Sequence, residues 1–90
     1  MVTLATENLN KNRLFEKAHI MCDAFRLGAE GQANEYCVEF CEDLVRYLPN
    51  LEDNTIQQIN NLLQLMLDAQ MNRDFLYVAD IVQYEILPKL

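Results

Sequence analysis

The stretch MCDAFRLGAEGQANEYCVEF, residues 21–40, decides the fold of this chain, because it holds the end of one amphipathic segment, a turn and the start of another. Its two glycines, Gly28 and Gly31, are the only glycines in the protein. Glycine tolerates the backbone conformations that a tight turn requires. Residues 21–40 therefore predict a helical hairpin that reverses direction between Gly28 and Gly31, at Ala29 and Glu30.

Apolar side chains recur every three or four residues on both sides of this turn, which is the spacing of one face of an α-helix. The first stripe consists of Leu14, Ala18, Met21, Cys22 and Phe25, and the second of Tyr36, Cys37, Phe40, Cys41, Leu44, Val45 and Leu48. We expect helices over residues 8–27 and 31–48. The second should end before Pro49, because proline disfavours helical geometry in the preceding residue and lacks a backbone N–H.

Two further helices are expected over residues 54–70 and 74–88. Thr55 and Gln58 have the spacing of a capping box at the start of the third, and Asp74 is a candidate N-cap for the fourth. No run of alternating β-branched residues indicates a strand. The sequence predicts one all-α domain over residues 1–90, a four-helix antiparallel bundle or two stacked helical hairpins. Its core should include Phe25, Phe40, Leu44, Leu63, Met66, Ala79 and Val82.

Size and charge restrict the possible functions. A domain of 90 residues buries only about 60–65% of the surface that its unfolded chain exposes, so burial against a partner would add substantially to its core. The formal net charge of −7 argues against nucleic-acid binding, which depends on clustered Lys and Arg. Between Glu30 and Asp53, Arg46 is the single base among seven acids. The beginning of the chain lacks a secretory signal pattern, so we expect a cytoplasmic protein.

The three cysteines and the single histidine could form a metal site. Cys22 follows His19 by three residues and Cys41 follows Cys37 by four, so an antiparallel hairpin would bring the two pairs near each other. One histidine and three thiolates are a suitable ligand set for zinc. The alternative is that the cysteines belong to the apolar stripes as small buried hydrophobes, reduced as is usual in the cytoplasm. We expect the second arrangement, with no cofactor.

The residues needed for catalysis are scarce. The chain has one histidine, no serine and no glycine-rich phosphate loop, and it lacks both an H-E-x-x-H and a C-x-x-C motif. We therefore expect no catalytic residues and a protein that is not an enzyme.

The last expected helix has more apolar side chains than one face can bury. At helical spacing, Phe75, Ala79, Val82 and Ile86 point to one side. The remaining large side chains are Leu76, Tyr77, Ile81, Tyr84 and Leu87. Contiguous exposed patches of this kind usually mark contact sites, so we expect these five residues to bind a second copy of the chain or another protein. The alternative is that neighbouring helices cover them within the monomer.

Two segments resemble a group of small helical proteins from Gram-positive bacteria to which no activity is assigned. They are FRLGAEGQANEYCVEFCEDL, residues 25–44, and NRDFLYVADIVQYEILPKL, residues 72–90. The matching positions are Phe25, Gly28, Phe75, Ala79, Asp80, Tyr84, Glu85 and Pro88. The resemblance implies a helical protein and no particular chemistry, and its pattern does not include the cysteines. In size and shape the expected bundle is also similar to flagellar export chaperones, short acidic helical bundles that hold a secretion substrate.

These observations favour a non-enzymatic protein–protein interaction module. We expect it to be homodimeric, to use the fourth helix as its contact surface and to act as a chaperone or adaptor. The alternative is a small metal- or thiol-sensing protein built on His19, Cys22, Cys37 and Cys41.

Overall fold

The computed structural model describes the backbone of residues 4–90 and the side chains from residue 11 onwards. Within that range the chain forms helices and no strand, which confirms the all-α fold class. The main helices are α1 (Leu4–Arg26), α2 (Glu30–Tyr47), α3 (Asp53–Met71) and α4 (Phe75–Asp80). Short helical segments follow α2, at Leu48–Asn50, and α4, at Ile81–Ile86 and Leu87–Lys89.

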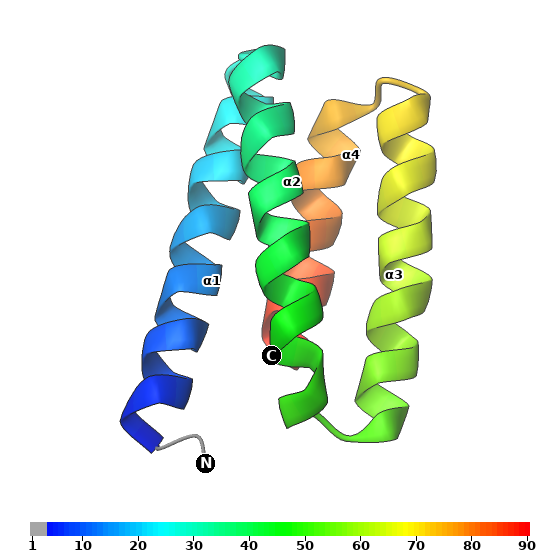
Figure 1. Cartoon of the computed structure of the whole chain (residues 1–90). Coiled ribbons are helices and arrows are strands. Elements are labelled where there is room, and N and C mark those ends of the chain that lie inside the picture. The colour runs from blue at the N-terminus through cyan, green and yellow to red at the C-terminus, as the bar shows by residue number, and fades with distance from the viewer. Residues whose placement is uncertain (1–3) are drawn as a thin grey trace.

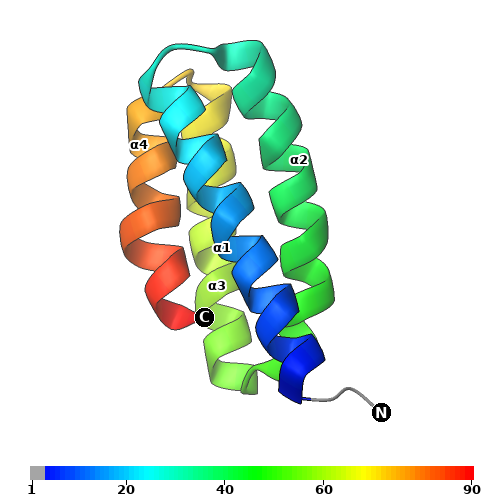
Figure 2. The ribbon, with the colours of Figure 1, turned by 90° about the vertical axis from the view of Figure 1, so that its left-hand side faces the viewer.

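The four helices run alternately up and down around a common core (Figure 1). Helix α1 packs against α2 and α4, and α4 packs against α3. Viewed from the side in Figure 2, α1 lies in front of α3, with α4 and α2 on opposite sides. Of the two arrangements expected from the sequence, the chain adopts the four-helix antiparallel bundle.

Helices α1 and α3 end in the same way, with a residue in the left-handed backbone conformation. After α1 this residue is Gly28, with φ +80°, and the N–H of Ala29 bonds back to the carbonyl of Ala24. After α3 it is Arg73, with φ +58°, and the N–H of Asp74 bonds to Ala69. These are Schellman motifs, which satisfy carbonyl groups left free at a helix end. Only the first was signalled by a glycine.

The helix starts agree in part with the sequence-based expectations. The side chain of Asp74 accepts a hydrogen bond of 3.3 Å from the N–H of Tyr77, as expected of the N-cap of α4. The predicted capping box at Thr55 and Gln58 is wrong, because α3 begins earlier, at Asp53, with Glu52 in the N-cap position.

The core is apolar throughout and receives side chains from all four helices. Its largest fully buried members are Phe40, Leu14, Met21, Leu44, Ile59 and Met66. Of the seven residues expected in the core, Leu63 is only partly buried, whereas the other six are buried. The Phe25 and Phe75 rings stack with their centroids 5.3 Å apart, so the last turn of α1 contacts the start of α4.

Among the described residues, no helix combines the length and the apolar character that crossing a membrane would require.

Candidate functional site

The final helix changes its winding at Ile81, and this decides which side chains remain exposed. Residues Ile81–Ile86 form a π-helical segment, in which hydrogen bonds join residues five apart. Residues five apart therefore share a face. Ile81 lies with Ile86, Val82 lies with Leu87, and all four are buried in the core.

Because of this winding, two of the five residues expected at the surface are buried instead, so the prediction is wrong for them. Ile81 is 1% exposed and Leu87 is 5% exposed. A regular α-helix would turn Ile81 well away from Ile86, which is why helical spacing suggested an outward position. The other three expected residues do face solvent, since Leu76 is 62%, Tyr77 is 43% and Tyr84 is 63% exposed.

A groove of about 340 Å³ lies between α3 and α4 beside these exposed residues. It is lined by Leu62, Leu65, Tyr77, Asp80, Ile81, Tyr84 and Glu85. Because Ile81 is buried yet lines the groove, it forms part of the floor, while the more exposed Tyr77 and Tyr84 stand at its sides. The two α3 leucines were not expected here. Leu65 is 41% exposed, and its apolar side chain was the one signal for it in the sequence.

A second hollow, of about 320 Å³, lies on the other side of Tyr84. Its lining residues are Phe15, His19, Gln83, Tyr84, Leu87 and Pro88. Tyr84 therefore forms a ridge between two apolar hollows. His19 belongs to this surface between α1 and the end of α4.

Arg26, at the end of α1, holds the ridge in place from one side. Its Nη2 lies 3.0 Å from Oδ1 of Asp80, and its Nη1 donates a hydrogen bond to Oε1 of Gln83. Its guanidinium also lies 5.9 Å from the centre of the Tyr84 ring. The hydrogen bond to Asp80 raises the pKa of Arg26, so the cation is retained. The network connects α1 to α4 and offsets the charge of Asp80 at the edge of the groove.

The three cysteines are free thiols that contact different partners. Cys22 donates to the carbonyl of Ala79 at 3.5 Å, and burial raises its pKa to about 11. Cys37 lies 3.9 Å from Oε1 of Gln70. The interaction of the Cys37 thiol with that of Cys41, one helical turn away, raises the pKa of Cys37 and lowers that of Cys41.

The proposed metal ligands do not form a common site. In the part of the chain that the structure describes, no three or more His, Cys, Asp or Glu side chains gather closely enough to hold a metal ion. His19 lines the hollow beside Tyr84, whereas Cys22 and Cys37 are buried in the core.

A comparison with family models matches residues 12–90 to a domain of unknown function, DUF8042. The chain belongs to this family. The matched region contains α2, α3, α4 and most of α1, so the groove and the Tyr84 ridge both lie within the DUF8042 domain. Searches of curated proteins and of solved structures gave no match.

Proposed function

We propose that this DUF8042 protein is a non-enzymatic interaction module that forms a homodimer through α4 and the α3–α4 groove. The observation that carries the proposal is the position of an exposed aromatic ridge directly beside an apolar groove on the same face. Tyrosine combines a large apolar ring with a polar tip and is enriched at protein interfaces.

A ridge and a groove on one face suit two-fold symmetry. In a two-fold interface the same patch of each copy meets its counterpart, so the patch must be complementary to itself. Tyr84 of one copy can enter the groove of the other, and the reverse contact then follows from the symmetry. The groove of about 340 Å³ offers room for such a side chain.

The charge distribution favours this face over the other side of the bundle. Glu35, Glu39 and Glu42 are exposed on α2, which lies diagonally across the bundle from α4 (Figure 2). Two copies joined through α4 therefore keep their most acidic helices apart. The α4 face itself carries charges of both signs. Arg26 is paired with Asp80, and Nζ of Lys89 lies 3.0 Å from Oε1 of Gln58 on α3.

The required contact area is modest. A stable interface of standard size buries about 800 Å² on each partner. The monomer exposes 5766 Å², so such a contact would cover roughly one seventh of it, which a single elongated face of the bundle can supply.

Light scattering coupled to size-exclusion chromatography, with Tyr84→Glu as the variant, tests the proposal. The new carboxylate would be desolvated without a partner, so we expect dimerisation to weaken by about 2 kcal/mol or more. Val38→Glu is the matched control, since Val38 is 59% exposed on α2 and Tyr84 is 63% exposed. Ile81 is unsuitable for this test, because a charge at a core position would unfold the monomer.

A wild-type protein that remains monomeric at high micromolar concentration would overturn the homodimer. An equal loss of dimer in Tyr84→Glu and Val38→Glu would place the contact elsewhere. If the isolated protein is monomeric but Tyr84→Glu abolishes capture of a helical segment of another protein, the same surface acts as a chaperone or adaptor site. No observation specifically favours the metal or thiol sensor.

A further inference from the structure

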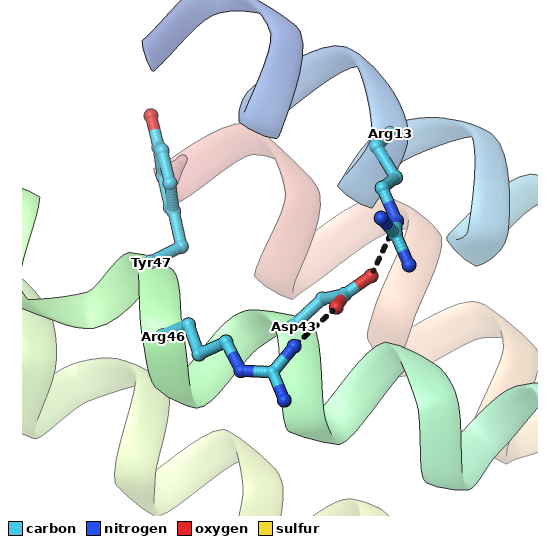
Figure 3. A pocket seen from close by; sticks show the side chains of 4 residues that line it. All are labelled: Arg13, Asp43, Arg46 and Tyr47. Carbon is cyan, nitrogen blue, oxygen red and sulfur yellow. Dashed lines mark ion pairs between the residues drawn. The ribbon is translucent and has the colours of Figure 1, made fainter. Parts of the chain in front are cut away.

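A cluster of basic side chains surrounds Asp43 at the end of the bundle where α2 finishes. Oδ2 of Asp43 lies 2.9 Å from Nζ of Lys17 and 3.4 Å from Nε of Arg13, and Oδ1 lies 3.6 Å from Nη1 of Arg46. The Asp43 side chain is only 14% exposed, so it is held between α1 and α2. Figure 3 shows Arg13 and Arg46 reaching Asp43 from different helices.

Both arginines form ion pairs with Asp43 that engage only one nitrogen of each guanidinium group. Arg13 approaches it through Nε, and Arg46 approaches it through one terminal nitrogen. Their side chains are 65% and 75% exposed, respectively. Guanidinium carries five N–H donors in a planar fork that matches the oxygens of phosphate and carboxylate groups. Among the side chains that the structure describes, Asp43 is the only ion-pair partner of either arginine, so their remaining donors are available to a ligand.

The charge of this cluster is opposite to that of the protein. Lys17, Arg13 and Arg46 contribute three positive charges against the one negative charge of Asp43, in a chain of net charge −7. Lys17 is only 18% exposed and does not line the hollow described below, so the charged groups that face a ligand there are Arg13, Arg46 and Asp43. Asp43 brings the three cations together and orients them, but it neutralises only one of them.

A hollow of about 110 Å³ lies beside the arginines and is lined by Arg13, Asp43, Arg46 and Tyr47. It is several times larger than the space required for one water molecule. The Tyr47 ring stands at its side, with the hydroxyl directed away from Asp43 (Figure 3). The polar groups that face a ligand are therefore mainly those of the two arginines.

We propose that this hollow, which we call the Arg13–Arg46 site, binds a phosphate group. A phosphate monoester carries about two negative charges at neutral pH, which both guanidinium groups attract, and its oxygens can accept hydrogen bonds from their outward N–H groups. The group can come from inorganic phosphate or from a phosphorylated side chain of another protein. The site lies on α1 and α2 and is independent of the α4 contact surface.

Titration with sodium phosphate at about pH 8, followed by NMR of the carbon-bound Cδ–Hδ signals of the arginines, which do not exchange with water, tests this site directly. Ionic strength should be held constant with sodium chloride. We expect saturable shifts at Arg13 and Arg46, and an affinity about tenfold weaker in Arg46→Gln, because a charge-assisted hydrogen bond is lost. Arg73→Gln is the matched control, since Arg73 is 70% exposed and pairs with Glu30 at 2.8 Å, away from the hollow.

A phosphoserine peptide and its unphosphorylated form separate the two sources of phosphate. Tighter binding of the phosphopeptide than of inorganic phosphate would assign the site to a phosphoprotein, and equal binding would assign it to free phosphate. Shifts that never saturate, or that sodium chloride alone reproduces, would overturn the proposal. So would an equal loss of affinity in Arg46→Gln and Arg73→Gln.

Discussion

At the scale of single residues, Arg26 affects the surroundings of Tyr84 in two ways. The Tyr84 ring divides two apolar hollows, and Arg26 holds it from the side through a contact at 5.9 Å to the ring centre. The same guanidinium pairs with Asp80 and so offsets an acid that would otherwise stand unpaired at the edge of the groove. Arg26 therefore packs beside the ridge and lowers the negative charge at the edge of the groove.

The cysteines should differ in reactivity according to their surroundings. At pH 8 a maleimide should modify Cys41 first, because it is partly exposed and its pKa is lowered, and the thiolate is the reactive form. Cys22 should resist modification, because it is buried and its pKa is raised to about 11. Its thiol therefore stays protonated at pH 8, at which an ordinary thiol with a pKa of 9.0 begins to ionise. Mass spectrometry of digested protein at successive times measures the order. As a control, all three cysteines should react at similar rates when urea unfolds the protein. Early modification of Cys22 in the folded protein would contradict its buried position.

At the scale of whole elements, the repeating apolar stripes were sufficient to predict four helices. Three features could not be read from them. The π-helical segment at Ile81–Ile86 depends on packing against α1 and α3, and the sequence carries no local mark of that winding. Arg73 adopts a left-handed conformation that sequence patterns assign to glycine. The partners of Asp43 include residues of a different helix, so the basic cluster is visible only after folding.

Gly28 in the α1–α2 connection and Gly31 in the first turn of α2 should respond in opposite ways to alanine. At Gly28 the φ of +80° disfavours any side chain, so Gly28→Ala should lower the free energy of unfolding by about 1 kcal/mol. Gly31 lies within α2, where alanine favours the helix, so Gly31→Ala should raise it by up to about 1 kcal/mol. A Cβ at either position would meet nothing within 4 Å, so no steric clash complicates the comparison. Urea denaturation of both variants measures the difference, and equal shifts would contradict the proposed turn geometry.

At the scale of the molecule, the bundle carries surfaces of different chemical character on different sides. The α4 face offers apolar area with few uncompensated charges, α2 carries exposed acids, and the Arg13–Arg46 site concentrates positive charge between α1 and α2. A copy bound at α4 leaves the α2 acids and the basic cluster accessible, because α2 lies diagonally across the bundle (Figure 2). Dimerisation and phosphate binding are therefore expected to be independent.

The response of dimerisation to salt should reveal what occupies the α4 face. Two copies of net charge −7 repel each other, and salt screens that repulsion, whereas apolar contacts around Tyr84 are little affected. We expect the homodimer to become on the order of tenfold tighter when sodium chloride rises from about 20 mM to about 150 mM. Sedimentation equilibrium at several salt concentrations measures the change in dimer affinity. The variant Glu85→Gln removes one negative charge at the groove, so it should reduce the salt dependence of that affinity. Association that weakens with salt would contradict this contact and show instead that opposite charges hold the two copies together, as expected if the α2 acids of one copy met the Arg13–Arg46 site of the other.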